Sequence, residues 1–260
     1  MPRFTANLTM LWQELPVLER FGAAADAGFR RVEILFVYDL DAAAVERTLR
    51  ELDLELVLFD PRPGDWSSGE RGLLSVPGRE EEFLETVREA IRAATRFGTR
   101  RINALAGIPP AGVAHEQAKR TAMANLRAAS RLVEKAGITL LVEAINTIDI
   151  PGYFASTADI AAELVTAGDS PNVRLQLDQY HVGMMGHDAR AVLRRYFPLV
   201  AHVQIADVPG RHQPGTGQQP IVGFLSDLDE LGYGGSVGLE YRPLGTTDDS
   251  LTWLPRELRS

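Results

Sequence analysis

The chain has 260 residues, 45% of them hydrophobic, and a formal net charge of −8, which suits a large globular core and argues against a broad surface for nucleic acid or anionic membranes. The sequence has no cysteine, so disulfides, thiolate metal sites and a cysteine nucleophile are excluded, and this composition fits a cytoplasmic protein. We expect no secretory signal and no transmembrane helix, because no apolar stretch is long enough for either.

Short apolar runs typical of buried strands alternate with amphipathic stretches along the chain. In chain order, the predicted strands are Phe4–Leu8, Arg31–Phe36, Leu54–Phe59, Arg101–Ala104, Thr139–Val142, Val173–Leu177, Val200–Ile205 and Ser236–Leu239. The clearest predicted helices, with apolar residues at three- and four-residue spacing, are Glu80–Phe97 and His115–Ala136. Several helix-like stretches end in glycine just before a strand, which is typical of a helix C-cap followed by a short loop.

This alternation predicts an α/β fold with a parallel sheet. Eight units favour a closed (β/α)8 TIM barrel, although the pattern alone is also compatible with an open doubly wound sheet. No linker separates domains, so we expect residues 1–260 to form one barrel domain. Two long loops rich in proline and glycine, Asp60–Arg79 and Asp207–Pro220, follow the third and seventh strands. Loops after barrel strands lie at the catalytic mouth, so we expect lids or binding loops here rather than plain connections.

Four oxygen-bearing side chains close consecutive strands in the C-terminal half of the predicted barrel: Glu143, Asp178, Gln204 and Glu240. They lie about one strand–helix unit apart, so a TIM barrel would bring all four to its mouth. Taken singly, a strand-end acid such as Asp178 is as often a helix N-cap. Taken together, three carboxylates in a small space would repel one another without a cation. Carboxylate and amide oxygens are hard ligands, so the set predicts a Mg²⁺ or Mn²⁺ site.

Two histidines lie near these predicted ligands. His181 follows Asp178 by three residues, and we expect it to donate a hydrogen bond to a substrate oxygen, although a lone histidine is more often packed or exposed. His202 precedes Gln204 by two residues on the same strand, so both should point to the same side, with His202 deeper. This position favours a supporting role for His202 over direct metal ligation.

At these residues the chain resembles the hydroxypyruvate isomerase family of the xylose isomerase-like (β/α)8 superfamily. The matching segments span nearly the whole chain: RFTANLTML, GFRRVEILFVYD, PGDWSSGERG, PGREEEF, LLVEAINTIDIPGY, LQLDQYH, HVQIADVPGR, PGTG and GLEYRP. The resemblance implies that the metal ligands are Glu143, Asp178, Gln204 and Glu240, and that the two glutamates are also the acid/base pair. Related sugar epimerases usually carry histidine at the position of Gln204, so the glutamine favours the isomerase branch.

The resemblance implies a metal-dependent reaction that interconverts hydroxypyruvate and tartronate semialdehyde through an enediolate. One glutamate removes the proton from the hydroxyl-bearing carbon, and the other returns a proton to the neighbouring carbon. A cation must hold the substrate carboxylate, for which Arg71 is the first choice and Arg211 the second, with a loop-ordering salt bridge as an equal alternative for either. We expect Trp66 to cover the site as part of a lid, or to anchor its loop.

The chain departs from the family pattern at three places. Phe59-Asp60 stands where a His-Asn pair is expected after the third strand, Ala144 replaces a proline, and Gln218 replaces a glutamate after PGTG. Asp60 bears most on substrate choice, because its charge at the mouth would disfavour a nearby substrate carboxylate. Three further polar side chains end strands, where pocket lining and structural hydrogen bonding are equally good interpretations: Asn7, Glu33 and Asn103.

Other functions stay open. A ketose 3-epimerase, or an isomerase of a four-carbon acid such as 2-oxo-tetronate, would use the same site on a longer substrate, with pocket length set by Phe36, Phe59 and Trp66. A nuclease of the superfamily would need more than the five histidines present and a basic groove, and a non-enzymatic barrel would lose ligands. We therefore expect a small hydroxy-oxo acid or sugar as ligand, and neither nucleic acid nor membrane. Barrels of this superfamily often associate, which is compatible with a homo-oligomer of unspecified size.

Overall fold

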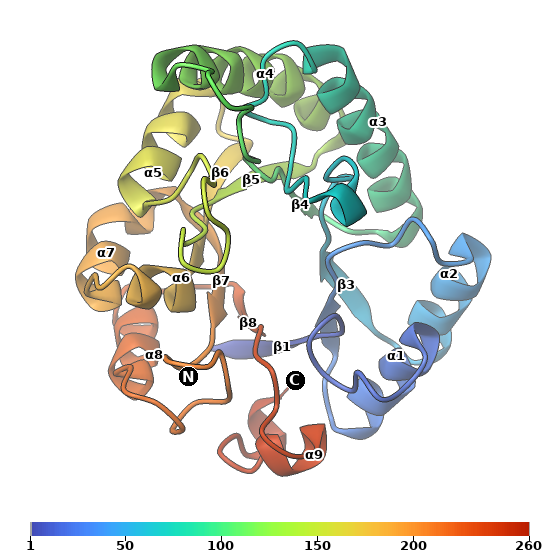
Figure 1. Ribbon diagram of the computed structural model, residues 1–260. Coiled ribbons are helices and arrows are strands. Elements are labelled where there is room, and N and C mark those ends of the chain that lie inside the picture. Colours follow the sequence, from blue (N-terminus) through green and yellow to red (C-terminus); the bar gives the residue numbers. More distant parts are fainter. Residues whose placement is uncertain (1, 260) are drawn as a thin grey trace.

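The predicted strands form a single parallel barrel in the computed structural model, which describes residues 2–259 (Figure 1). The strands are β1 (Arg3–Asn7), β2 (Arg31–Glu33), β3 (Glu55–Leu58), β4 (Arg101–Asn103), β5 (Thr139–Glu143), β6 (Val173–Asp178), β7 (Val200–Ile205) and β8 (Ser236–Leu239). They neighbour one another in the order β3-β2-β1-β8-β7-β6-β5-β4. This order closes on itself as a ring, so the prediction of a TIM barrel is confirmed.

The helices surround the ring of strands (Figure 1). They are α1 (Val17–Asp26), α2 (Ala42–Glu51), α3 (Glu80–Phe97), α4 (His115–Ala136), α5 (Ala158–Ala167), α6 (Gln179–Met184), α7 (Ala189–Tyr196), α8 (Ile221–Glu230) and α9 (Thr247–Ser250), with the 3₁₀ turns η1 (Trp66–Ser68), η2 (Phe197–Leu199) and η3 (Arg256–Leu258). The bounds predicted for α3 and α4 are confirmed. Both end at a glycine with positive φ, Gly98 at 73° and Gly137 at 66°, a conformation that glycine adopts without steric cost.

Three strands are shorter than predicted, namely β2, β3 and β4, and β2 differs most. We expected the second strand to run to Phe36, but β2 ends at Glu33. The backbone N–H of Leu35 donates to the Thr9 hydroxyl at 2.8 Å instead of to a neighbouring strand, so a side chain draws the backbone out of the sheet. The hydrophobic run continues beyond this point, which is why the sequence pattern alone placed the end too late.

Side chains alternate across the barrel wall, as the pleat of a strand requires. On β6, Val173, Leu175 and Leu177 belong to the buried core between the sheet and the helices. The intervening Gln176 and Asp178 point into the barrel, where they contact side chains from β7 and from the loops at the mouth. Burial of one large apolar side chain in such a core stabilises the fold by about 1.5–3 kcal/mol. The apolar core between the sheet and the helices therefore stabilises the barrel, and the side chains that point into the barrel can be polar.

The ring is joined least extensively between β3 and β4. Within residues 2–259, the two strands share one isolated parallel bridge, between Phe59 and Ile102, and the N–H of Asn103 donates to the Phe59 carbonyl at 3.2 Å. Other neighbouring strands pair over several residues, for example β7 with β8 from Val203 to Ile205. The barrel is thus nearly closed, and Asp60 and Asn103 lie where this seam reaches the mouth.

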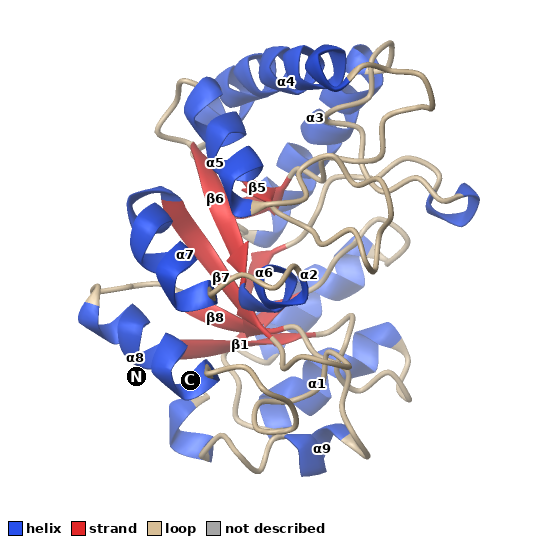
Figure 2. Cartoon of the chain, turned by 60° about the vertical axis from the view of Figure 1, so that its left-hand side comes forward, coloured by secondary structure: helices blue, strands red, loops and turns tan. Residues whose placement is uncertain are grey.

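The two long loops project from the same end of the barrel (Figure 2). The loop 60–79 carries η1, whose first turn is capped by the Asp65 carboxylate through the N–H groups of Ser67 (3.0 Å) and Ser68 (3.2 Å). In the loop 207–220, the buried Asp207 carboxylate accepts the N–H groups of Gly215 (2.9 Å) and Gly217 (2.8 Å). Each loop is therefore ordered by one acidic side chain.

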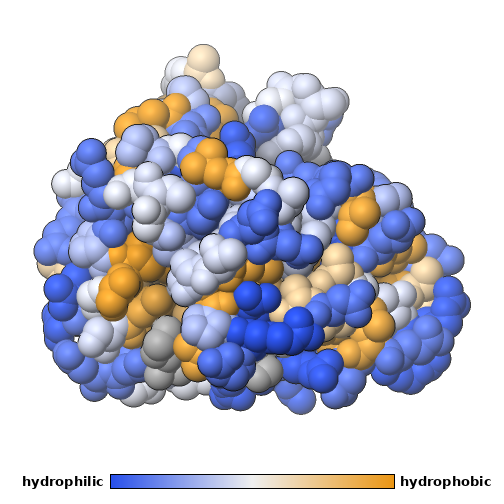
Figure 3. Space-filling model, turned by 90° about the horizontal axis from the view of Figure 1, so that it is seen from below, coloured by the Kyte–Doolittle hydropathy of each residue, from blue (hydrophilic) through white to orange (hydrophobic). Residues whose placement is uncertain are grey.

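The outer surface that carries α9 is mainly hydrophilic, with apolar atoms in separate areas (Figure 3). Such a surface is expected for the water-facing side of an amphipathic helical ring. Among residues 2–259, no helix combines the length and the apolar character needed to cross a membrane.

Candidate active site

The mouth of the barrel contains a cavity of about 530 Å³. All eight strand ends, or the loops that follow them, contribute to its wall. Glu143, Gln204 and Glu240 line the cavity, and Asp178 lies beside them with its side chain buried. The fold thus brings the four predicted ligands together at the end of the barrel where TIM-barrel enzymes carry their active sites.

Glu143, Asp178 and Glu240 form a buried carboxylate cluster. Each is less than a tenth exposed, and the carboxyl groups of Asp178 and Glu240 hydrogen-bond each other. Burial, followed by the negative charges of Glu240 and Asp178, raises the pKa of Glu143 well above its usual range. Burial is also the largest cause of the raised pKa values of Asp178 and Glu240. Ionised carboxylates crowded in this way favour the binding of a cation.

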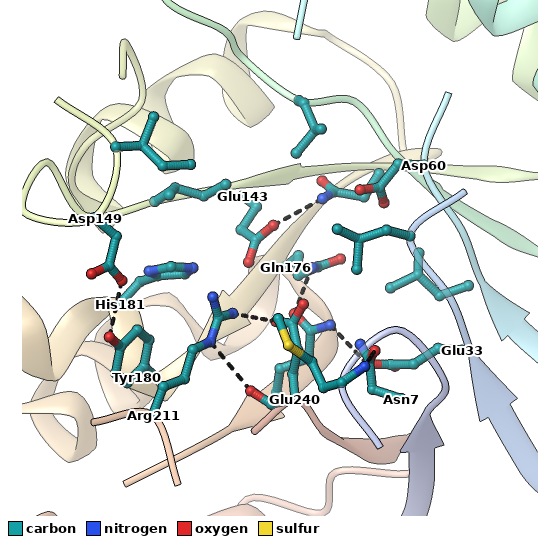
Figure 4. A pocket seen from close by; sticks show the side chains of 18 of the residues that line it. Asn7, Glu33, Asp60, Glu143, Asp149, Gln176, Tyr180, His181, Arg211 and Glu240 are labelled. Carbon is teal, nitrogen blue, oxygen red and sulfur yellow. Dashed lines mark hydrogen bonds and ion pairs between the residues drawn. The ribbon is translucent and has the colours of Figure 1, made fainter. Parts of the chain in front are cut away.

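Arg211 supplies a positive charge at this cluster. Its Nη2 atom lies 2.8 Å from Glu240 Oε2 and 3.4 Å from Asp178 Oδ2 (Figure 4). The guanidinium also lies over the Tyr180 ring, 4.9 Å from its centroid. The backbone of Arg211 has a φ of 57°, which is uncommon for a residue other than glycine, and its carbonyl accepts the N–H of Arg242 at 2.7 Å. The loop after β7 therefore holds Arg211 in a defined position over the carboxylates.

Gln204 belongs to a hydrogen-bonded network at the floor of the cavity. Its Nε2 donates to Glu33 Oε1 at 2.8 Å, and its Oε1 accepts from Gln176 at 2.7 Å, which fixes the orientation of the amide. Glu33 also accepts from Asn7 at 2.9 Å and pairs with His202 Nε2 at 2.8 Å. His202 therefore supports Glu33, which in turn holds Gln204, in keeping with the supporting role predicted for this histidine.

The hydrogen bonds of His181 define its tautomer. Its Nδ1 accepts from the backbone N–H of Asn146 at 3.4 Å and lies 2.7 Å from Asn146 Nδ2. The Asn146 Oδ1 accepts the N–H groups of Ile148 and Asp149, so the amide nitrogen must face the ring. The proton of His181 therefore lies on Nε2, which faces Asp178 Oδ2 at 3.5 Å. Burial lowers the pKa of His181 well below its usual range, so the ring is a neutral hydrogen-bond donor.

The donor set fits a hard divalent cation. Ligand atoms of Glu143, Asp178 and His181 lie within 4.8 Å of one another, so this group could hold a metal ion. The tautomer of His181 directs a hydrogen toward the same space, which favours the carboxylates over the imidazole as ligands. Glu240 adjoins Asp178, and Gln204 Oε1 keeps one lone pair beyond its bond from Gln176. These oxygens match the chemistry of Mg²⁺ and Mn²⁺ ligands.

Arg71 and Trp66 lie together at the outer edge of the cavity. The Arg71 guanidinium lies 4.0 Å from the centroid of the Trp66 ring, and its Nη1 donates to the Trp66 carbonyl at 3.0 Å. Trp66 packs edge-on against Phe36 and is 41% exposed. Within residues 2–259, no carboxylate forms an ion pair with Arg71, so its charge is available to an anion in the cavity. Both residues line the cavity.

Several wall residues were not among the predicted site residues, and Gln176, Tyr180 and Asp149 are three polar examples. Gln176 shares the inward face of β6 with Asp178, so period-two alternation from Asp178 would have identified it. The Tyr180 hydroxyl donates to Asp149 Oδ2 at 2.9 Å, across 31 positions of sequence. No spacing rule shows that contact. The cavity wall also includes the three other strand-end residues that were considered in the sequence analysis: Asn7, Glu33 and Asn103.

Comparison with known proteins identifies the family of this chain. The family model for xylose isomerase-like TIM barrels matches residues 21–257. The chain is 40% identical to the 2-oxo-tetronate isomerase of Cupriavidus necator and 40% identical to the hydroxypyruvate isomerase of Escherichia coli, in each case over 98% of both chains. A crystal structure from Brucella melitensis, described as an AP endonuclease of family 2, is 42% identical with a TM-score of 0.94, covering 97% of this chain and 98% of that one. The chain belongs to the hydroxypyruvate isomerase family of xylose isomerase-like TIM barrels and is an enzyme.

Proposed function

We propose that this enzyme isomerises small 2-oxo acids that carry a hydroxyl group on the carbon next to the ketone. Interconversion of hydroxypyruvate and tartronate semialdehyde is the simplest such reaction. The observation that carries the proposal is the buried cluster of Glu143, Asp178 and Glu240 beside Arg211 at the barrel mouth. Relatives that are 40% identical, named 2-oxo-tetronate isomerase and hydroxypyruvate isomerase, support the substrate class.

The proposed cofactor is Mg²⁺ or Mn²⁺, held by Glu143, Asp178, Gln204 and Glu240. When bound, such an ion polarises the substrate carbonyl and stabilises negative charge on the substrate oxygens. The pKa values of Glu143, Asp178 and Glu240 are all raised, which means that their ionised forms are poorly stabilised by the surrounding protein. A bound cation would stabilise these ionised forms, so the raised pKa values support the proposed metal site. The network below Gln204 supports it as well, because fixed orientation of a ligand is typical of metal sites.

Glu143 and Glu240 are the proposed acid/base pair. They close β5 and β8, so they approach the cavity from different sides. One carboxylate removes the proton from the hydroxyl-bearing carbon of the substrate, which leaves an enediolate. The other, as a carboxylic acid, delivers a proton to the former carbonyl carbon. Burial raises the pKa of Glu240 to about 8, which suits a group that exchanges protons near neutral pH, and the pKa of Glu143 is raised as well.

The hydroxyl proton must also move, from the original hydroxyl oxygen to the former carbonyl oxygen. His181 is the proposed hydrogen-bond donor for this step, because its Nε2–H faces the cavity beside Asp178 and its ring is neutral. Tyr180 and Asn146 hold the histidine from behind, by ring contact and by hydrogen bonding. The imidazole is therefore preorganised to contact a substrate oxygen rather than free to rotate.

Arginine side chains are the proposed partners of the substrate carboxylate. Arg211 lies deepest and keeps Nη1 as a donor, because its Nη2 contacts Glu240 and Asp178 and its Nε donates to the Glu240 carbonyl. Arg71 lies nearer the opening, over Trp66, and we propose that these two close the mouth above the bound substrate. The small, acid-lined cavity and the net charge of −8 favour a small-molecule substrate over nucleic acid.

The test is an isomerisation assay of hydroxypyruvate, 2-oxo-tetronate and a free ketose in ²H₂O, with Mg²⁺ or Mn²⁺. We expect the 2-oxo acids to be converted, with deuterium incorporated from the solvent at the carbon that gains a proton. Glu143→Gln serves as the matched variant that should lose conversion while remaining folded. Conversion of the ketose but of neither 2-oxo acid would overturn the proposal in favour of an epimerase.

A further inference from the structure

Arg242 is an arginine on the cavity wall that the proposed reaction does not use. It follows Glu240 by two residues, and the buried Tyr241 between them packs in the apolar core. Because side chains alternate along an extended segment, Glu240 and Arg242 point to the same side. Both line the cavity, but Glu240 is buried and the Arg242 side chain is exposed. Arg242 therefore faces the same cavity as Glu240, nearer to the solvent.

Two hydrogen bonds hold the backbone of Arg242 beside Arg211. Its N–H donates to the Arg211 carbonyl at 2.7 Å, and its own carbonyl lies 2.7 Å from His212 Nδ1. A carbonyl oxygen can only accept, so the His212 ring donates this second bond. The loops after β7 and β8 are joined at this point. The side chains of Arg211 and Arg242 therefore start from neighbouring backbone positions.

The guanidinium of Arg242 has its hydrogen-bond donors free, whereas most of those of Arg211 are used. Within residues 2–259, the Arg242 side chain forms neither an ion pair nor a hydrogen bond. Arg211 contacts Glu240 and Asp178 through Nη2 and donates from Nε to the Glu240 carbonyl at 3.3 Å. Only Nη1 of Arg211 is left for a substrate, and its charge is shared with two acids. A carboxylate has two acceptor oxygens, so a second cation is needed to satisfy it.

The strand order favours Arg242 over Arg71 as this second cation. Strand β8 adjoins β7, whereas β3 lies four strands from β7 in a ring of eight. Arg71 belongs to the loop after β3, lies over Trp66, and donates from Nη1 to the carbonyls of Trp66 (3.0 Å) and Glu70 (2.7 Å). A single carboxylate is too small to meet cations on opposite sides of the mouth. Arg211 and Arg242 can share one, and Arg71 is left to cover it.

The charge of the remaining wall supports the same place for the substrate carboxylate. The wall also carries several acidic residues: Glu33, Asp60, Glu143, Asp149 and Glu240. A carboxylate that entered among them would be repelled, whereas one at Arg211 and Arg242 would be attracted. The substrate then enters with its reacting carbons toward the two glutamates and its carboxylate toward the side of β7 and β8.

We propose that Arg242 and Arg211 form a two-arginine clamp for the substrate carboxylate, and that Arg242 sets the preference for 2-oxo acids over uncharged ketoses. The clamp rests on the proposed isomerase function, because that function requires a carboxylate on the substrate. Arg242 contacts the substrate but takes no part in proton transfer.

The experiment compares hydroxypyruvate with dihydroxyacetone, which has the same reacting carbons but a hydroxymethyl group in place of the carboxylate. Arg242→Gln should lower kcat/KM for hydroxypyruvate by about 10- to 100-fold, as for loss of a charged hydrogen bond, and leave that for dihydroxyacetone unchanged. The loss should fall on KM, because the carboxylate contact is the same before and during proton transfer. Arg242→Lys, which keeps the charge but loses the planar fork, should retain part of the preference.

A second readout does not depend on turnover. Pyruvate lacks the hydroxyl group and cannot isomerise, so its Kd can be measured by calorimetric titration of the Mg²⁺-loaded protein. In Arg242→Gln this Kd should rise by about the same factor as KM. Arg120→Gln is the matched control, because Arg120 is an exposed arginine of α4 outside the cavity. It should leave KM and the pyruvate Kd at their wild-type values.

Arg71→Gln tests the rival cation and should change the ratio of the two substrates less than Arg242→Gln does. A larger change in Arg71→Gln would overturn the inference and place the carboxylate at Arg71. Equal losses on both substrates in Arg242→Gln, with unchanged pyruvate affinity, would overturn it as well and assign Arg242 a structural role beside Arg211. Failure of the proposed isomerase function is a separate result, namely a wild type that converts neither hydroxypyruvate nor 2-oxo-tetronate.

Discussion

The two halves of the barrel mouth differ in how many of their polar groups have a hydrogen-bond or ion-pair partner. On the side of β5 to β8, Arg211 forms ion pairs with Asp178 and Glu240, and Glu143 lies close to Asp178. On the side of β3 and β4, Asp60 hydrogen-bonds Asn103, and the Asn103 Oδ1 is buried without a hydrogen-bond partner among the described residues. We propose that the side of β5 to β8 carries out proton transfer and that the side of β3 and β4 contacts the rest of the substrate.

The floor between the halves connects them. Glu33, on β2, holds Gln204 on β7 through the 2.8 Å bond from its amide, and it also affects the charge state of Asp60. The buried Glu33 carboxylate thus orients Gln204 on one side of the mouth and raises the pKa of Asp60 on the other. Substitutions at the two halves should therefore affect different kinetic parameters, with effects at the floor in between.

The largest effect is expected on the proton-transfer side. Glu240→Gln should leave a folded barrel and lower kcat on every substrate by about 10³-fold or more, because it removes a proton-accepting group. Solvent deuterium exchange into the substrate and kcat are the measurements, with circular dichroism to check the fold. Full activity in this variant would contradict the acid/base assignment and, with it, the division of the mouth into two roles.

A smaller effect is expected for Arg211, the cation beside the carboxylate cluster. Arg211→Lys keeps the charge but loses the planar fork that meets a carboxylate through two donors. We expect KM for 2-oxo acids to rise by about tenfold, as for loss of one charged hydrogen bond, with kcat less affected. A fall in kcat at unchanged KM would instead assign Arg211 to the acidic cluster alone.

Substitution of Glu33, at the floor of the cavity, should have the smallest effect on kcat and a clear effect on metal affinity. Glu33→Gln weakens the acceptor that orients Gln204, so we expect Mn²⁺ affinity to fall by about 10- to 100-fold, as for other supporting residues of metal sites. At saturating Mn²⁺ the rate should recover most of its wild-type value. Unchanged affinity would show that Gln204 needs no such support or is not a ligand.

The sequence predicted correctly those features that depend on residues close together in the chain or on the order of the strands. The bounds of β7 and β8 were predicted as observed, because each is a short run rich in apolar residues between turn residues. The four strand-end side chains could be predicted as neighbours, because barrel topology alone brings consecutive strand ends together. β2 was predicted too long, because the bond from Leu35 to the Thr9 hydroxyl is a tertiary contact.

Contacts between distant segments account for the rest of the site. The tautomer of His181 depends on Asn146, 35 positions away, and the orientation of Gln204 depends on Glu33, 171 positions away. The raised pKa of Asp60 depends on burial and on the charges of Glu240 and Glu33, which only the folded arrangement brings near it. Spacing along the chain therefore identified which groups meet, but not which hydrogen bonds define their protonation and direction.

Metal binding by the carboxylate cluster is the central claim, and its most direct test is a calorimetric titration of chelator-treated protein with Mn²⁺. The raised pKa values of Glu143 and Glu240 mean that ionising them costs folding free energy at neutral pH, above their unfolded pKa of about 4.3, and a bound cation offsets that cost. We predict one ion per chain, lost in Asp178→Asn, and a gain of about 2.7 kcal/mol in stability at a hundredfold excess over Kd. Wild-type isomerisation by protein shown to be metal-free, or a titration without binding, would contradict the account.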